Sequence, residues 1–384
     1  MKVVYFTESL PPQTDGVART LVNLIRTLES QQVDFRFISP FKPDNSFPWS
    51  EKVYKVISVP FILYRDYRLS LPVLDRLELE DVLDSFAPDI IHTVSPTALG
   101  IMGLNYAISN NIPAVSSYHT HFVSYFKYYG LSLVENVGWN YLRWFYNQFN
   151  RIYAPSKSAA DELREKGIEN IDLWQRGIDI TKFSPEYRSE ALRHSFGISK
   201  DDCILLFVGR LVKEKDLDDL VAMDKILKKM NLHYRLVLVG DGPMREELEE
   251  ELPEAHFTGY LHNEDLSQLF ASSDIFVFPS TTETFGNVIL EAYASGVPVV
   301  TVDKGGVADL IKHGETGFVA KSNDPADFAR YVQAMITHPE MRKSLGIQAK
   351  EYSKEFNWEH INTRLISSYQ EIIENYAMLN KLKK

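Results

Sequence analysis

The first half of the chain alternates short runs of apolar, often β-branched residues with longer stretches in which apolar residues recur every three or four positions. The short runs are typical of buried strands, and the longer stretches are typical of helices that pack by one face. We predict strands at residues 3–7, 34–39, 90–94 and 113–118, and helices at residues 17–28 and 71–86. Strands alternating with helices predict a parallel sheet with helices on both faces.

The alternation stops in a polar stretch at residues 180–200, which we interpret as a linker, and then restarts. Six further strands are predicted, at residues 203–208, 234–239, 256–257, 274–278, 297–300 and 317–319. Helices are predicted to begin near Leu217, Pro243, Asn263, Gly286 and Val307, and a last amphipathic helix at Trp358. The predicted fold class is therefore α/β, with two Rossmann-like, doubly wound domains, at residues 1–185 and 200–357, facing a central cleft.

Composition narrows the class of protein. Of the 384 residues, 45% are hydrophobic and 24% are charged, which is ordinary for a folded globular chain. The net charge is −11, so the chain lacks the excess of basic residues that is typical of a nucleic-acid-binding protein. Cys203, the single cysteine, opens an apolar run and is predicted to lie in the core, which favours a reducing compartment. No apolar stretch resembles a signal peptide or a membrane span, so we expect a cytoplasmic protein.

Residues 279–292 carry two carboxylates eight positions apart, Glu283 and Glu291. Glu283 is predicted to lie in a strand-to-helix loop, where unpaired backbone N–H groups and the helix dipole favour an anion such as phosphate. Glu291 follows about two turns later, near the same side. The alternatives are that Glu283 caps the helix or is solvated, and that Glu291 pairs with a basic neighbour.

This segment resembles the Glu-X7-Glu signature of family four, the large family of retaining nucleotide-sugar glycosyltransferases with the two-domain GT-B fold. Matching residues run from Gly16 to the final helix. The resemblance implies that Glu283 approaches the transferred sugar and that Glu291 accepts hydrogen bonds from the nucleotide ribose. Backbone N–H groups for the phosphate are implied at Gly286, Asn287 and Val288. The helix at residues 358–384 is implied to cross back and pack on the N-terminal domain.

Two cations, Arg210 and Lys215, follow the first strand of the second predicted domain. An arginine binds phosphate oxygens bidentately and a lysine acts as a compact charge, so the two suit a departing nucleoside diphosphate. The alternative is a solvated basic loop. The resemblance implies that both residues bind the diphosphate.

The turn at residues 239–243 contains Gly240 and resembles a dinucleotide-binding fingerprint, but Arg245 stands where the third glycine is required. A hydride-transfer function is therefore disfavoured. The family resemblance implies instead that Gly240 shapes the floor of the nucleotide pocket and that Tyr260 lies beside the base. A purely structural turn remains the alternative for Gly240.

In the first predicted domain, Gly16 precedes a helix and suits close approach of a phosphate or an acceptor hydroxyl. Many relatives have two adjacent glycines here, whereas this chain has Asp15, which could cap the helix. His119 ends a predicted strand and resembles the family's active-site histidine, which is thought to bind a hydroxyl of the donor sugar. It is favoured over His121, and a structural histidine is the alternative.

Residues 118–153 contain thirteen aromatic side chains with interspersed cations, and residues 58–72 form a second aromatic and basic loop. Such mixtures suit a membrane interface, although the rings could equally fill the core. Together with Arg176 and Asp179, expected to line the cleft, these regions resemble the branch of plant sulfoquinovosyl transferases and bacterial mannosyltransferases that act on glycosylated diacylglycerol.

The predicted function is retaining transfer of a hexose from GDP-mannose or a UDP-hexose to an acceptor hydroxyl, on a diacylglycerol-type glycolipid at the inner membrane face. The alternatives are a soluble or polysaccharide acceptor, a nucleotide-sugar epimerase of the same architecture, and a non-catalytic sensor of nucleotide sugars. No Asp-X-Asp metal site stands out near the donor residues, so we expect no required metal or cofactor beyond the nucleotide sugar.

Overall fold

The computed structural model describes residues 1–13, 15–61, 64–119, 132–199 and 202–382. The described chain divides into two compact units. Unit 1 contains the chain up to Gln175 and again from Trp358, and unit 2 contains Arg176–Asn357. Unit 2 therefore begins before residue 185, where the first domain was predicted to end.

Unit 1 is built on a seven-stranded parallel sheet with the order β3-β2-β1-β6-β7-β8-β9. Its strands are β1 (Lys2–Phe6), β2 (Asp34–Ser39), β3 (Val53–Lys55), β6 (Ile90–Thr93), β7 (Ala114–Ser117), β8 (Arg151–Ala154) and β9 (Ile171–Leu173). Its helices are α1 (Gly16–Ser30), η1 (Ser50–Lys52), α2 (Arg76–Phe86), α3 (Ala98–Ser109), α5 (Ser132–Tyr146), α6 (Lys157–Glu165) and α14 (Trp358–Leu382). The order reverses direction between β1 and β6, as in Rossmann folds.

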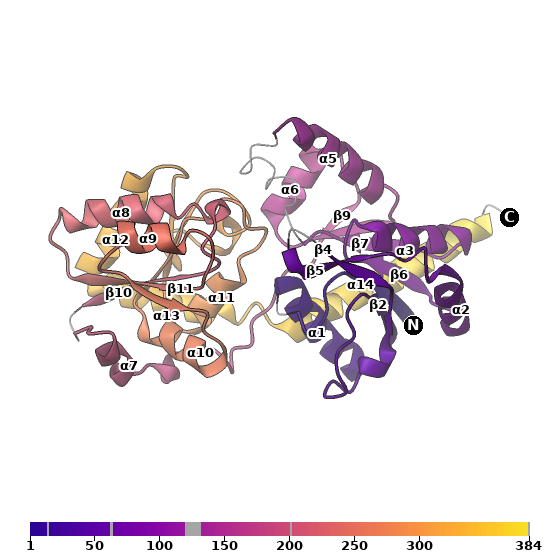
Figure 1. The fold of residues 1–384 in the computed structure, drawn as a ribbon, viewed down its shortest axis with the longest axis horizontal. Coiled ribbons are helices and arrows are strands. Elements are labelled where there is room, and N and C mark those ends of the chain that lie inside the picture. The colour runs from indigo at the N-terminus through magenta and orange to yellow at the C-terminus, as the bar shows by residue number, and fades with distance from the viewer. Residues whose placement is uncertain (14, 62–63, 120–131, 200–201, 383–384) are drawn as a thin grey trace. The chain divides into compact units, whose positions relative to one another are not determined.

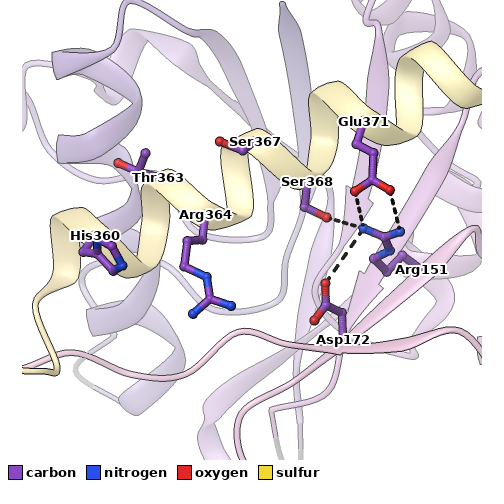
Figure 2. A pocket seen from close by; sticks show the side chains of 8 residues that line it. All are labelled: Arg151, Asp172, His360, Thr363, Arg364, Ser367, Ser368 and Glu371. Atoms are coloured by element: carbon purple, nitrogen blue, oxygen red, sulfur yellow. Dashed lines mark hydrogen bonds and ion pairs between the residues drawn. The ribbon is translucent and has the colours of Figure 1, made fainter.

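The alternation of side chains along β1 divides the core of unit 1 into two layers. Val4 and Phe6 pack under α2, α3, α5 and α6, whereas Val3 and Tyr5 pack under α1 and α14. The polar edge of α14 is also tied to the sheet: Arg151 Nη1 donates to Ser368 Oγ (2.8 Å) and to Glu371 Oε2 (3.1 Å) (Figure 2). The last helix is thus part of the core of unit 1.

Unit 1 differs from the prediction in several regions, since β3, β8, β9, α3, α5 and α6 were not predicted. A separate antiparallel hairpin of β4 (Ser58–Phe61) and β5 (Tyr64–Ser70) precedes α2. The helix predicted at residues 71–86 begins only at Arg76, because the chain leaves β5 through a turn at residues 71–75.

Unit 2 has a six-stranded parallel sheet with the order β12-β11-β10-β13-β14-β15. Its strands are β10 (Cys203–Val208), β11 (Tyr234–Val239), β12 (His256–Gly259), β13 (Ile275–Phe278), β14 (Val299–Val302) and β15 (Gly317–Ala320). Its α-helices are α7 (Glu190–Ser195), α8 (Asp218–Lys228), α9 (Arg245–Glu251), α10 (Asn263–Ser272), α11 (Asn287–Ala294), α12 (Pro325–Thr337) and α13 (Pro339–Ser353). Short 3₁₀ turns are η2 (Pro185–Tyr187), η3 (Lys213–Lys215) and η4 (Ala308–Leu310). Helices α8, α9 and α12 cover one face, and α10, α11 and α13 cover the other (Figure 1).

All six strands predicted for the second domain are present, and Cys203 is buried in the core as predicted. Burial raises the pKa of its thiol to about 12, which keeps it protonated and unreactive. The helix predicted near Val307 is only the 3₁₀ turn η4. Within the described ranges, no helix combines the length and apolar character needed to cross a bilayer.

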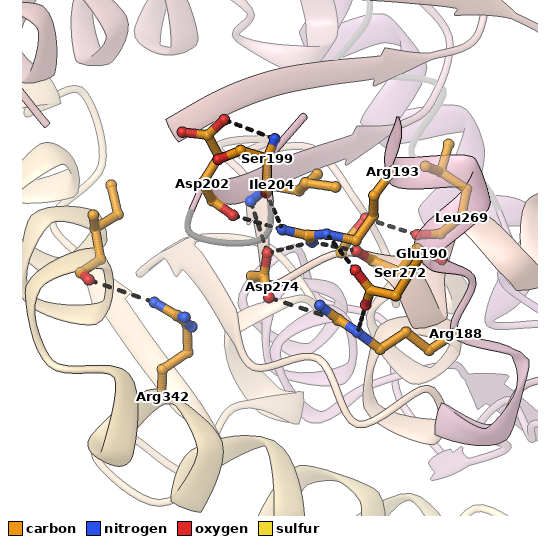
Figure 3. A network of polar contacts seen from close by, with 12 residues as sticks. Arg188, Glu190, Arg193, Ser199, Asp202, Ile204, Leu269, Ser272, Asp274 and Arg342 are labelled. Atoms are coloured by element: carbon orange, nitrogen blue, oxygen red, sulfur yellow. Dashed lines mark hydrogen bonds and ion pairs between the residues drawn. The ribbon is translucent and has the colours of Figure 1, made fainter. Parts of the chain in front are cut away.

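The prediction of a linker at residues 180–200 was wrong. This segment folds into η2 and α7, which belong to unit 2. Arg193, only 1% exposed, holds it in place: Nη1 donates to the Ser272 oxygen and to Asp274 Oδ2, both at 2.8 Å, and Nη2 donates to the Asp202 oxygen at 2.6 Å (Figure 3). The segment looked like a linker because it is polar, but its polar residues bond to Ser272 and Asp274, where α10 is joined to β13.

Candidate active site

The switch point of the unit 2 sheet lies between β10 and β13, which are hydrogen-bonded neighbours with reversed connections on either side. Ligands of doubly wound folds bind at the carboxyl ends of such strands. The loop with Arg210 and Lys215 follows β10, and the loop with Glu283 follows β13. The sheet therefore brings both predicted donor segments to one edge.

Lys215 and Glu283 meet directly at this edge. Lys215 Nζ forms a hydrogen-bonded ion pair with Glu283 Oε1, although 68 positions separate the residues in sequence. Their side chains are 17% and 26% exposed, and Nζ also lies 5.7 Å from the centroid of the Phe278 ring. Partial burial strengthens the electrostatic interaction relative to a pair in open solvent. The alternatives of a solvated Lys215 and a capping Glu283 are therefore disfavoured.

Residues that the sequence analysis missed hold the Glu283 loop. Asp216 Oδ2 accepts hydrogen bonds from the backbone N (2.8 Å) and the hydroxyl (2.7 Å) of Thr281. The Thr282 hydroxyl donates to the Glu214 backbone oxygen (2.7 Å). An acidic residue just after the Lys215 position was the available signal, but its partner lies too far along the chain to be predicted from spacing.

A second loop supports the other side of Glu283. Gly306 N donates to the Glu283 backbone oxygen (2.6 Å), and Gly305 has a φ of 75°. A Cβ atom at Gly305 would stand 2.8 Å from the same oxygen. The backbone of Glu283 is thus clamped between two neighbouring loops of unit 2.

Helix α11 begins at Asn287, and its N-cap, Gly286, has a φ of 90° that favours glycine. Gly286 has no side chain with which to cap this helix end, and no side-chain cap hydrogen bond is found there among the described residues. The Asn287 Oδ1 atom is buried without a hydrogen-bond partner in the described part of the chain. An uncapped helix end that carries the Gly286, Asn287 and Val288 N–H groups is chemically suited to a phosphate.

Glu291 lies one turn into α11 and is 5% exposed, so it is not a solvated surface carboxylate.

Arg210 is exposed at the start of its loop, and no described carboxylate pairs with it. Among the described side chains, no group of three or more His, Cys, Asp or Glu residues is arranged to hold a metal ion.

The turn after β11 has a structural explanation. Gly240 has a φ of 132°, and a Cβ atom there would stand 1.9 Å from the Gly209 oxygen. The glycine is needed because this turn packs against the start of the Arg210 loop. Tyr260 is 58% exposed, and its hydroxyl donates to the Asp241 oxygen (3.2 Å), so its ring is accessible at the next turn.

In unit 1, Gly16 is the first residue of α1, and Asp15 caps that helix. Asp15 Oδ1 accepts from Val17 N (2.8 Å) and Ala18 N (2.9 Å). Because a carboxylate already occupies these N–H groups, the capping alternative is favoured over phosphate binding at Gly16.

His119 follows β7, and His121 lies outside the described residues. The Nε2 atom of His119 is 2.7 Å from Ser117 Oγ, and its ring lies edge-on to Trp174 with centroids 5.6 Å apart.

Arg176 is buried, and burial lowers its pKa to about 9. Asp179 Oδ1 closes a local turn by accepting from Thr181 N (3.1 Å) and its hydroxyl (2.6 Å).

Glu8 is a further residue that the sequence analysis did not single out. It follows β1, at the switch point of the unit 1 sheet. Its two carboxylate oxygens accept from the hydroxyls of Ser70 (2.7 Å) and Thr97 (2.8 Å), and burial raises its pKa. Thr97 is the N-cap residue of α3, yet its hydroxyl bonds to Glu8 instead of to the helix.

Most described rings of residues 118–153 belong to the core. Six are buried, namely Tyr118, Trp139, Phe145, Tyr146, Phe149 and Tyr153. Tyr141 and Trp144 are exposed on α5. The five remaining aromatic residues lie outside the described residues. For the described residues, the core alternative therefore accounts for more rings than a membrane interface does.

Comparison with known proteins agrees with this geometry. The family model for glycosyl transferases group 1 matches residues 188–352, and the model for Glycosyltransferase Family 4 matches residues 14–182. The chain is 33% identical to the GDP-mannose-dependent alpha-mannosyltransferase of Corynebacterium glutamicum, covering 97% of this chain and 89% of that protein. It is 31% identical to the sulfoquinovosyl transferase SQD2 of Arabidopsis thaliana (95% and 72% covered).

The alpha-monoglucosyldiacylglycerol synthase of Streptococcus pneumoniae is 27% identical to the chain (96% and 88% covered). Among solved structures, sucrose-phosphate synthase from Thermosynechococcus elongatus superposes with a TM-score of 0.79 at 20% identity, covering 97% of this chain and 99% of that one. The fold is thus GT-B, as predicted. The chain belongs to family 4 of the GT-B glycosyltransferases and is a hexosyltransferase that uses a nucleotide sugar.

Proposed function

We propose that the chain transfers a hexose, with retention of anomeric configuration, from GDP-mannose or a UDP-hexose held by unit 2. The observation that carries this proposal is the Lys215–Glu283 pair beside the uncapped start of α11. A cation and the N–H groups at a helix start suit the diphosphate, and a carboxylate beside them suits the sugar hydroxyls.

In the proposed reaction, the bond from the anomeric carbon to the diphosphate breaks as the acceptor hydroxyl attacks from the same face, and the hydroxyl proton passes to an oxygen of the departing diphosphate. Negative charge then grows on the departing diphosphate, where Arg210, Lys215 and the N–H groups of α11 stabilise it. Glu283 and His119 bind hydroxyls of the donor sugar, and Glu291 binds the ribose. GDP-mannose is the first donor to test, because the C. glutamicum relative is named for it.

The test incubates the purified protein with GDP-mannose, UDP-glucose or UDP-galactose, with and without lipid extract and with and without chelator. Free nucleotide and new glycolipid are measured by mass spectrometry, and the anomeric configuration of the product by NMR. Acceptor-dependent product of retained configuration supports the proposal. Consumption of donor without acceptor supports an epimerase, and binding without turnover supports a sensor. Turnover lost in chelator and restored by magnesium or manganese would contradict the expected metal independence.

We further propose a diacylglycerol-type glycolipid as the acceptor, reached by peripheral contact of unit 1 with a membrane. The S. pneumoniae relative is named for such a lipid. Exposed large apolar side chains concentrate between residues 57 and 77 of this chain: Ile57, Val59, Leu71, Val73, Leu74 and Leu77. A cluster of this kind on a soluble surface suits an interaction with an apolar partner. We call it the 57–77 surface.

Sedimentation with anionic vesicles tests the membrane contact. Val73→Glu, at a side chain that is 80% exposed, is expected to reduce the bound fraction. Ile347→Glu is the matched control, because Ile347 is 71% exposed on α13 of unit 2. Added salt should weaken binding if headgroup charge contributes. Absence of sedimentation at low salt, or equal losses in both variants, would favour a soluble acceptor.

A further inference from the structure

Four side chains of unit 1 form a hydrogen-bonded chain that runs from α14 through the sheet to His119. The Tyr369 hydroxyl lies 2.6 Å from Nδ1 of His92, and Nε2 of His92 lies 2.9 Å from Ser117 Oγ. Ser117 Oγ lies 2.7 Å from Nε2 of His119. These residues come from α14, β6 and β7 and from the segment after β7, so the chain connects the last helix to the predicted active-site histidine.

The middle of this hydrogen-bonded chain is buried and closely packed. His92, Ser117 and Tyr369 are at most 1% exposed. Four aromatic rings surround His92 at centroid distances of 5.3 to 5.9 Å: Tyr5, Tyr153, Trp174 and Tyr369. Burial lowers the pKa of His92 to about 3, so its ring is neutral near pH 7 and carries one proton. One ring nitrogen must therefore donate and the other must accept.

If every hydroxyl and N–H proton of the hydrogen-bonded chain is used in a hydrogen bond, the donors can point in one of two directions along it. In one, Tyr369 donates to His92, His92 donates to Ser117, and Ser117 donates to Nε2 of His119. In the other, each donor and acceptor is exchanged, and Nε2 of His119 carries the proton. Either direction specifies the role of the His119 Nε2 atom, and the fixed Ser117 hydroxyl specifies where that nitrogen points.

We propose that Tyr369, His92 and Ser117 are positioning residues. They orient the His119 ring toward the donor sugar and determine which of its two ring nitrogens is protonated. This inference rests on the proposed function, in which His119 binds a hydroxyl of that sugar. It gives α14, at the far end of the sequence, a role in the site beyond completing the core of unit 1.

The test compares Tyr369→Phe with Tyr153→Phe. Each substitution removes one buried hydroxyl at α14. The Tyr369 hydroxyl belongs to this helix, and the Tyr153 hydroxyl lies 2.7 Å from Ser368 Oγ of the same helix. Only Tyr369 is part of the hydrogen-bonded chain to His119. Tyr369→Phe and Ser117→Ala are expected to lower kcat/KM for the donor about tenfold, the scale of losing a group that orients a site residue. Tyr153→Phe is expected to stay within about twofold of the wild type.

A second readout does not depend on catalysis. Couplings between ring protons and nitrogens in histidine-labelled protein report which nitrogen of each ring is protonated, and His119→Gln assigns the His119 signals. We expect one neutral tautomer of His119 in the wild type and in Tyr153→Phe, and a changed or mixed tautomer in Ser117→Ala and Tyr369→Phe. If Ser117→Ala fails to fold, Tyr369→Phe decides, since it keeps the ring.

The outcomes separate this inference from the proposed function. Wild-type turnover together with an unchanged His119 spectrum in Tyr369→Phe overturns the positioning role, and so does an equal loss of turnover in Tyr153→Phe. If His119→Gln transfers sugar normally, the assigned role of His119 fails, whereas the spectra still report whether the chain orients its ring.

Discussion

The pairing of Lys215 with Glu283 makes each side chain a fixed feature of the unit 2 edge. A lone lysine on a surface loop samples many rotamers, and ordering it costs conformational entropy. Here the carboxylate and the Phe278 ring confine the ammonium group. A diphosphate would therefore meet a localised charge, which is the condition under which charge stabilisation in an active site is most effective.

Removing the charge of Glu283 or of Arg210 should lower turnover and leave the fold intact. Glu283→Ala and Arg210→Ala are each expected to lower kcat at least about a hundredfold, the scale for losing one preorganised charge contact. Lys213→Ala, at an exposed cation of the same loop, is the control and should stay near the wild-type rate. Initial rates with GDP-mannose and circular dichroism provide the measurements. A near-normal rate in either variant would remove that residue from the proposed mechanism.

Buried His92 should make the protein sensitive to acid. Its folded-state pKa of about 3 lies below the ordinary value of 6.5, so between these values the unfolded chain binds more protons than the folded one. The free energy of unfolding therefore falls as pH falls through 6.5, by about 2 kcal/mol between pH 7.5 and pH 5. His92→Gln should remove about that much of the pH dependence in urea titrations. Equal pH dependence in both proteins would show that His92 is protonated or solvated in the fold.

At the scale of elements, close backbone approach explains a glycine that looked like a ligand contact. Gly240→Ala would place a Cβ atom 1.9 Å from the Gly209 oxygen at a φ of 132°. We expect it to lower the free energy of unfolding by about 3 kcal/mol. Gly197→Ala is the matched control: its φ is 66° but no atom lies within 4 Å of the new Cβ, so about 1 kcal/mol is expected. Similar losses measured by denaturation would mean that the turn relaxes around the new methyl group.

The elements that the sequence predicted best are those whose side chains alone determine their place. β10 is buried at all six positions, and its unbroken apolar run was sufficient to predict it. The helix α7 was missed because Arg193 is stabilised in part by Asp274, 81 positions away, and no local pattern predicts that contact. Likewise, His92 stands as a polar residue inside a predicted buried strand, a signal that its partners would have to be found elsewhere in the chain.

The two units of the molecule were both expected, and Lys215 and Glu283, which lie at the edge of unit 2, were both singled out from the sequence. The family resemblance implied a diphosphate role for Lys215 and a sugar role for Glu283, but their direct ion pair was not predicted, because no local pattern relates residues 68 positions apart. The hydrogen-bonded chain to His119 could not be predicted, since it joins three separate segments through the packing of unit 1.

At the scale of the whole molecule, unit 1 should depend on α14. Five large side chains of this helix are buried in its core: Ile361, Leu365, Ile366, Tyr369 and Ile372. Their burial contributes about 2 kcal/mol each, which together is comparable to the stability of a domain. A chain ending at Asn357 should therefore lose the tertiary structure of unit 1, as measured by tryptophan fluorescence and proteolysis. A chain ending at Tyr376, which loses only exposed apolar residues, is the control and should fold normally.

Because unit 1 is assembled from two stretches of sequence with unit 2 inserted between them, the order of synthesis and the order of folding differ. The described part of unit 2 lies between Arg176 and Asn357, so all of it has been synthesised as soon as Asn357 has left the ribosome. Unit 1 is begun first but lacks part of its core until α14 follows. Throughout that interval the side chains of α1 that pack against α14 lack this covering, so we expect the nascent chain to expose an apolar surface of the kind that promotes aggregation. Synthesis of α14 thereby also determines when unit 1 can complete its core.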